Sequence, residues 1–85
     1  MKEIKYVIKD ELGIHARPAG LLVKKLIEFP GNVQIGNAQK MVDGKRIFSV
    51  MGLGFKQGDE MTLTFEGAGE VEAAAAAEQF LKATL

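Results

Sequence analysis

The spacing of apolar residues changes along the chain, and each spacing predicts a different element. Three apolar residues near the N-terminus alternate with charged ones, which is typical of a strand with one buried face. These residues are Ile4, Tyr6 and Ile8. From Ala16 to Ile27 the apolar residues recur at every third or fourth position, which predicts a helix with one apolar stripe. Pro30 ends this helix, because the residue before a proline is pushed out of helical geometry.

The middle of the chain predicts a hairpin followed by a short helix. Val33 and Ile35 alternate with polar neighbours, and a turn separates them from a second short run at residues 40–42. Asp43-Gly44 is a further turn signal. Residues 47–51 beyond it are too densely apolar for a strand with two different faces, so a short helix is predicted there.

A last strand and a long helix are predicted for the C-terminal third. Met61, Leu63 and Phe65 alternate with polar residues and form the buried face of a strand. Glycines interrupt this pattern, and the alanine-rich run that begins at Glu70 has a high helix propensity. Acidic residues in its first turn and Lys82 near its end suit the helix dipole.

The predicted elements follow in the order β-α-β-β-α-β-α, which places the chain in the α+β class. Each element has one apolar face, so three helices can cover one face of a sheet while the other face stays in water. The expected result is a two-layer fold. Because 85 residues suffice for one hydrophobic core, we expect residues 1–85 to form a single domain.

Composition and charge narrow the functional classes. The 11 basic and 11 acidic residues cancel, so the chain lacks the positive charge for general binding to nucleic acid or to anionic lipid. The absence of cysteine excludes disulfides and thiol chemistry, and one histidine leaves too few ligands for a closed zinc site. No apolar run approaches the roughly 18 residues of a membrane-spanning helix, and the N-terminal residues lack a signal-peptide core. We therefore expect a cytoplasmic monomer that uses neither a metal nor a cofactor.

His15 is the only histidine of the chain, and it stands at the predicted start of the first helix. A helix start has unpaired N–H groups and a partial positive charge, so the backbone amides of Ala16 and Arg17 can hold an anion there. The Arg17 guanidinium matches phosphate oxygens, and the positive helix end favours an uncharged, nucleophilic imidazole. A phosphoryl site is one interpretation. A histidine that only caps the helix or fills space is the other, and the spacing does not separate them.

The segment LGIHARPA, from Leu12 to Ala19, resembles the active-site signature of the HPr family, the histidine phosphocarriers of the bacterial sugar phosphotransferase system. The resemblance extends to IFSVMGLG at residues 47–54 and to the order of the elements, so it covers essentially the whole chain. It implies an open-faced β-sandwich with a four-stranded antiparallel sheet and three helices on one face. It also implies that His15 accepts a phosphoryl group on Nδ1 from phosphorylated enzyme I, beside Arg17, and passes it to sugar-specific EIIA proteins. Such a protein is a carrier and not an independent enzyme.

The partners of such a carrier need a docking surface beside His15. The outward face of the first helix carries small, charged and apolar residues, namely Ala16, Gly20, Lys24 and Ile27. In the arrangement that the resemblance implies, the short second helix lies beside it and adds three apolar residues, namely Ile47, Phe48 and Met51. The sequence leaves open the alternative that these three residues belong to the core, as predicted for Val50 and Leu53.

One position departs from the pattern of many HPr proteins of Gram-positive bacteria. Where these proteins have a regulatory serine that an ATP-dependent kinase phosphorylates, this chain has Arg46. Arginine cannot accept that phosphate and carries the opposite charge, so the serine switch is expected to be missing. Ser49 is not expected to replace it, because it falls inside the predicted short helix. Arg46 therefore keeps a second hypothesis open, namely an HPr-like regulatory module that binds proteins with little or no phosphoryl relay.

Overall fold

The seven predicted elements are all present, in the predicted order, in the computed structural model, which describes all 85 residues. The strands are β1 (Lys2–Val7), β2 (Asn32–Gly36), β3 (Met41–Asp43) and β4 (Glu60–Glu66). The helices are α1 (Ala16–Ile27), α2 (Ile47–Met51) and α3 (Glu70–Thr84). The bounds of α1 and α2 and the start of α3 agree with the sequence prediction. None of the three helices combines the length and the apolar character needed to cross a bilayer.

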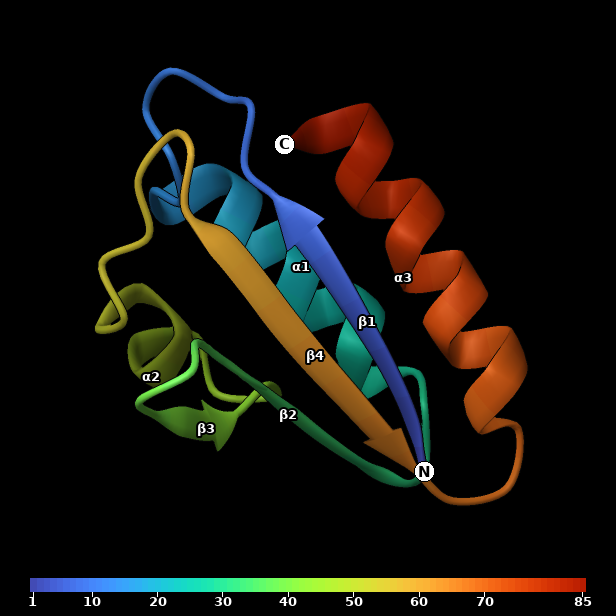
Figure 1. The fold of residues 1–85 in the computed structure, drawn as a ribbon. Helices are drawn as coiled ribbons and strands as arrows, with labels where there is room; N and C mark the ends of the chain where they lie inside the picture. The colour runs from blue at the N-terminus through green and yellow to red at the C-terminus, as the bar shows by residue number, and fades with distance from the viewer.

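The strands form one antiparallel sheet in the order β1-β4-β2-β3 (Figure 1). β4 lies inside the sheet, where Leu63 stands opposite Ile4 of β1 and opposite Ile35 of β2. β2 also pairs with β3, which confirms the predicted hairpin. The α+β class and the four-stranded antiparallel sheet are therefore confirmed.

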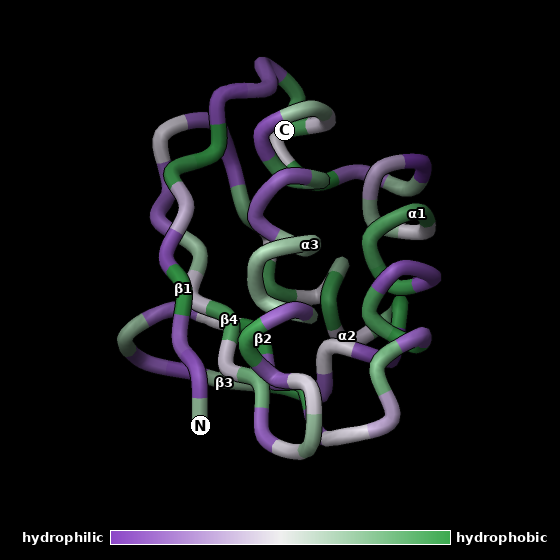
Figure 2. Tube along the Cα trace, turned by 90° about the vertical axis from the view of Figure 1, so that its right-hand side faces the viewer, coloured by the Kyte–Doolittle hydropathy of each residue, from purple (hydrophilic) through white to green (hydrophobic).

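The helices cover one face of this sheet, and the core lies between the two layers. Figure 2 shows the strands β1, β4 and β3 toward the left and the helices α1 and α2 toward the right. Along β4, Met61, Leu63 and Phe65 are buried, whereas Thr62 and Thr64 alternate with them on the open face. The core is one cluster of 20 buried apolar residues, and no polar or charged residue is buried. The predicted two-layer arrangement is confirmed.

The helix that begins beside His15 is attached to the core along one stripe. This stripe consists of Ala19, Leu22, Val23 and Leu26, all of which are buried. Burial of each large apolar side chain contributes roughly 2 kcal/mol, so α1 is firmly held. Just after α1, the ring of Phe29 packs edge-on against Phe65, with the ring centroids 5.9 Å apart. The opposite face of α1 is left to solvent.

The start of α3 is bonded to the N-terminal amine. The Met1 ammonium lies 2.8 Å from the Glu70 Oε2 atom, and the Glu70 carboxylate also accepts the backbone N–H of Gly67 at 3.3 Å. The hydrogen bond from the amine, followed by the one from Gly67, lowers the pKa of Glu70 below its usual 4.5. In turn, the hydrogen bond to Glu70 raises the pKa of the amine above its usual 8.0. Both groups remain charged between these two values.

Candidate functional site

His15 occupies the N-cap position of α1 and is partly exposed. Its backbone is extended, with φ −124° and ψ −177°, and its carbonyl oxygen accepts the N–H of Ala19 at 3.0 Å. The imidazole makes no capping hydrogen bond and no other hydrogen bond within the protein. The interpretation of His15 as a side-chain cap is therefore wrong, and both ring nitrogens are free of protein partners.

The first turn of α1 offers unpaired donors beside this imidazole. The backbone N–H groups of Ala16 and Arg17 have no acceptor within the protein, and Pro18 has no N–H to leave unpaired. The Arg17 side chain is exposed and forms no ion pair. Two amides at the positive end of a helix and one free guanidinium suit an anion bound on the imidazole. This arrangement is what the phosphoryl interpretation of His15 requires.

The loop before His15 is held by contacts that the sequence pattern does not reveal. Asp10 closes the turn, because its Oδ1 accepts the N–H of Leu12 at 2.8 Å and its carbonyl accepts the N–H of Gly13 at 3.0 Å. Gly13 has a φ of +66°, and a Cβ at this position would lie 2.3 Å from the carbonyl oxygen of Phe55. Only glycine permits both this conformation and this close approach. The loop that carries His15 is thus packed on the segment that follows α2.

Most of the residues predicted for docking reach the surface. Five are exposed, namely Ala16, Lys24, Ile27, Phe48 and Met51. Phe48 has 85% of its surface exposed and Ile27 has 56%, so the alternative that Phe48 belongs to the core is wrong. Ile47 and Gly20 are half-buried, because the Ile47 Cδ1 atom packs over Gly20 where α2 meets α1. Val50 is fully buried, as predicted, and Leu53 packs against the core.

Two exposed apolar residues beside the site were not predicted. Leu12, three positions before His15, is 73% exposed, and Leu21 on α1 is 45% exposed. Leu21 lies one turn beyond Arg17 and outside the buried stripe of α1, so helical periodicity alone identifies it as an outward residue. No comparable signal exists for Leu12, because it lies in a loop. Together with Phe48 and Ile27, these residues give the surface around the two helices an apolar character.

Arg46 lies at the N-cap position of α2, directly before Ile47. Its side chain is 77% exposed, and its Nε atom lies 3.5 Å from the Oδ2 atom of Asp43, which is itself half exposed. Such an exposed pair contributes little stability, so the guanidinium remains accessible. Ser49 is the third residue of α2 and is partly buried, in agreement with the prediction that it falls inside the helix.

Comparison with known proteins identifies the family. The family model described as "PTS HPr component phosphorylation site" matches residues 2–83. A phosphocarrier protein HPr from Lysinibacillus sphaericus is 42% identical over 73 residues, which cover 86% of this chain and 83% of that protein. Both similarities span nearly all the elements described above.

Solved structures agree with this assignment. A crystal structure of HPr from Thermoanaerobacter tengcongensis has a TM-score of 0.93 and 36% identity, and covers 99% of this chain and 94% of its own. A Mycoplasma histidine-containing phosphocarrier protein has a TM-score of 0.92 and 32% identity, and covers 98% and 94% of the two chains. The Bacillus subtilis protein Crh, described as a domain-swapped dimer, has a TM-score of 0.77 and 29% identity, and covers 100% and 98%. The chain therefore belongs to the HPr family of phosphocarrier proteins of the phosphotransferase system.

Proposed function

We propose that this chain carries phosphoryl groups in carbohydrate uptake, accepting them on His15 from phosphorylated enzyme I and passing them to EIIA proteins. The observation that carries this proposal is the free imidazole at the start of α1 beside the unpaired N–H groups of Ala16 and Arg17. Membership of the HPr family supports the same chemistry. On this basis residues 1–85 act as one cytoplasmic domain, and the relay itself needs neither metal nor cofactor.

The transfer step is a displacement at phosphorus. The lone pair of Nδ1 of His15 attacks the phosphoryl group, the new N–P bond forms, and the bond to the donor breaks with its electron pair leaving on the donor. The proton of the neutral ring stays on Nε2. The amides of Ala16 and Arg17 and the Arg17 guanidinium donate to the phosphoryl oxygens. Because these donors are already in place, little reorganisation accompanies the transfer.

The same phosphoryl group has to leave again, so His15 must be reachable by two different partners. Its partial exposure and the exposed apolar residues on both neighbouring helices support such access. Phe48 and Ile27 offer apolar contact area to a partner, and the exposed Lys24 adds a positive charge to the same surface. We assign this surface, with Ala16, Gly20, Ile47 and Met51, to docking of enzyme I and EIIA to a monomer.

A second candidate function is a regulatory module that binds proteins through this surface without relaying phosphate. The accessible guanidinium of Arg46 at the start of α2 favours it, because it stands where a regulatory serine is found in many family members. Similarity to Crh, whose structure is described as a catabolite repression HPr, points the same way. The retained His15 with Arg17 makes the carrier the better-supported candidate.

Incubation with enzyme I and labelled phosphoenolpyruvate tests the proposal. The wild-type chain is expected to acquire an acid-labile label, and the His15→Ala variant to acquire none while its circular dichroism stays unchanged. Addition of an EIIA domain is expected to remove the label from the wild-type chain. A wild-type chain that stays unlabelled, beside an HPr that the same enzyme I labels, would rule out the carrier. A label that forms but never reaches EIIA would support the regulatory module.

A further inference from the structure

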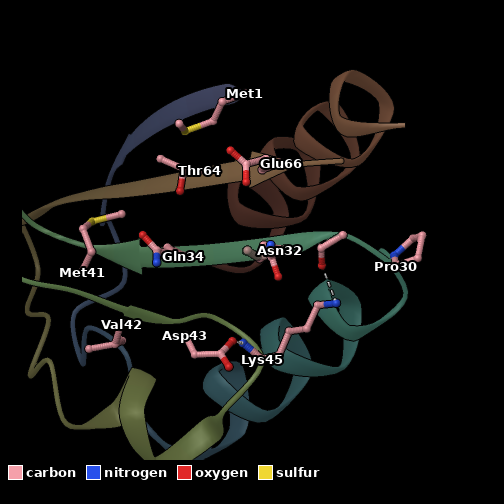
Figure 3. Close-up of a pocket in the computed structure, with 12 residues that line it drawn as sticks. Met1, Pro30, Asn32, Gln34, Met41, Val42, Asp43, Lys45, Thr64 and Glu66 are labelled. Carbon is pink, nitrogen blue, oxygen red and sulfur yellow. Dashed lines mark hydrogen bonds between the residues drawn. The ribbon is translucent and has the colours of Figure 1, made fainter. Parts of the chain in front are cut away.

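Lys45 lies in the connection between β3 and α2, outside the surface that carries His15. Its Nζ atom donates to the carbonyl oxygen of Phe29 at 2.5 Å and to that of Gly31 at 2.8 Å. Figure 3 shows the side chain reaching across to the turn that follows α1, with one of these bonds drawn as a dashed line. These bonds join residues that are 14 and 16 positions apart in the chain.

The carbonyl groups that receive this ammonium belong to the turn in which α1 ends. Both carbonyls lie beyond Ile27, the last residue of α1, and neither accepts a backbone N–H, so the ammonium is their hydrogen-bond partner. Hydrogen bonds from a charged donor are about twice as strong as those between neutral groups. The Lys45 side chain therefore attaches the β3–α2 connection to the turn that follows α1.

The backbone at Lys45 is fixed as well. The N–H of Lys45 donates to Oδ1 of Asp43 at 2.9 Å, and the N–H of Gly44 donates to the carbonyl of Val33 at 2.9 Å. A Cβ on Gly44 would lie 3.0 Å from Val33 Cγ1 and 3.2 Å from Leu26 Cδ1, so this segment sits directly on α1 and β2. α2 begins two residues later, at Ile47. Arg46 is therefore the one residue between Lys45 and the first residue of α2.

A ligand-binding role explains Lys45 less well. Lys45 lines a polar hollow of about 520 Å³ together with residues of β2, β3 and β4, seen in Figure 3. Its ammonium already donates to two backbone carbonyls, so it is not free to bind a ligand in this hollow. The contacts of Lys45 are with the protein itself, and they connect the segment that precedes α2 with the turn that follows α1.

We propose that Lys45 is a positioning residue for docking, which holds α2 against α1 so that Phe48 stands at a fixed place relative to His15. This inference rests on the carrier function proposed above. α2 has only five residues, of which Val50 alone is buried in the core, and Ile47 packs over Gly20 of α1. So short a helix does not maintain its position by itself, because isolated helices of this length are unstable in water. The ammonium of Lys45 adds an attachment on the side of the chain that leads into α2.

Lys45→Met tests this role, because methionine keeps the apolar stem and removes the ammonium. With enzyme I as donor, the variant is expected to show a KM about tenfold higher than the wild type and an unchanged kcat, because the loss of both charged hydrogen bonds of Lys45 weakens docking and leaves the reacting groups intact. Lys45→Arg, which can reach the same carbonyls, is expected to recover most of the change. The matched control is Lys5→Met on the open sheet face, where the lysine has no bonded partner, and its KM is expected to equal that of the wild type.

A structural readout in the same variants separates this inference from the carrier proposal. In wild type, a nuclear Overhauser effect between the Ile47 Cδ1 methyl and the Gly20 Hα protons reports the contact of α2 with α1. Lys45→Met is expected to weaken it and to speed amide exchange in α2, and this result stands even if enzyme I fails to label the wild-type chain. A folded Lys45→Met with an unchanged Overhauser effect, or with an unchanged KM, overturns the positioning role. If Lys45→Met does not fold, Lys45→Gln carries the same two measurements.

Discussion

The backbone N–H of Ile14 donates to the carbonyl oxygen of Phe55 at 3.2 Å, so the residue before His15 is bonded to a segment 41 positions later. The same carbonyl oxygen is the atom that a Cβ on Gly13 would meet. The loop from β1 to α1 and the loop after α2 therefore form one unit. The position of the imidazole therefore depends on this contact as well as on the start of α1.

The Gly13→Ala variant is predicted to be less stable than the wild type and to have a displaced His15 loop. The variant places a Cβ 2.3 Å from the Phe55 carbonyl oxygen in a left-handed conformation. The conformational strain costs about 1 kcal/mol and the displacement of packed backbone about 2 kcal/mol, so the free energy of unfolding is expected to fall by roughly 3 kcal/mol. Urea unfolding followed by circular dichroism measures the change.

The matched control for this prediction is Gly58→Ala. Gly58 also has a positive φ, of +92°, but a Cβ there would meet no atom within 4 Å. Only the conformational strain of about 1 kcal/mol is therefore expected. Equal losses of stability in the two variants would show that the contact with Phe55 has no effect of its own.

Phe48→Ala is predicted to weaken docking while leaving stability almost unchanged. Because 85% of the Phe48 surface is exposed, its truncation is expected to change the free energy of unfolding by less than about 0.5 kcal/mol. Exposed aromatic side chains are frequent anchors of protein interfaces, and removal of one is expected to raise the KM with enzyme I about tenfold. Steady-state phosphorylation of the chain measures this change.

Val50→Ala, on the same short helix, is predicted to have the opposite effect: it lowers stability and leaves docking unchanged. Val50 is fully buried, so its truncation is expected to lower the free energy of unfolding by about 2 kcal/mol and to leave the KM of the folded protein unchanged. If Val50→Ala weakened docking and Phe48→Ala did not, the apolar surface on α2 would not be the docking site.

The sequence predicts α1 from Ala16 to Ile27 correctly, because two local signals agree there. The apolar stripe that begins at Ala19 is regular, and Pro30 shortly after the helix prevents its continuation. The same holds for the start of α3 at Glu70, where glycines precede a run of strong helix formers. His15 could therefore be assigned to a helix start without the structure.

The contacts that hold the site in place could not be predicted, because they join distant segments. Nothing near His15 in the sequence points to Phe55, and nothing near Lys45 points to the carbonyl of Phe29. Periodicity also fails for α2, because five residues are too few to show which face is buried. Phe48 and Ile47 are adjacent and both apolar, yet Phe48 is exposed and Ile47 is half-buried. Only the fold shows this difference.

Glu70→Gln is predicted to lower the melting temperature slightly, by an amount that depends on pH. The pKa of Glu70 is lowered in the folded chain, so the stability that it contributes is present above its unfolded value of 4.5 and is lost as the pH falls through the folded pKa. The pKa of the Met1 amine is raised, so its contribution is full below 8.0 and is lost as the pH rises through the folded pKa. The difference between wild type and variant is therefore expected to be largest between pH 4.5 and pH 8.0. Thermal unfolding across this range measures it, and a difference that is constant with pH would contradict the role of the ion pair.

Gly20→Ala is predicted to stabilise the chain by about 1 kcal/mol, because glycine inside a helix is less favourable than alanine by that amount. Gly20 lies within α1 where it meets α2, and the nearest atom to a Cβ there is Ile47 Cδ1 at 3.7 Å, an ordinary contact distance. The added methyl group fits, and it extends the contact that holds α2 in place. Gly36→Ala is the contrasting variant, since its Cβ would lie 1.9 Å from the Lys40 carbonyl oxygen, and it is expected to be strongly destabilised. Urea unfolding measures the free energy of unfolding of both variants. A destabilised Gly20→Ala would show that α2 lies too close to α1 for the added methyl group.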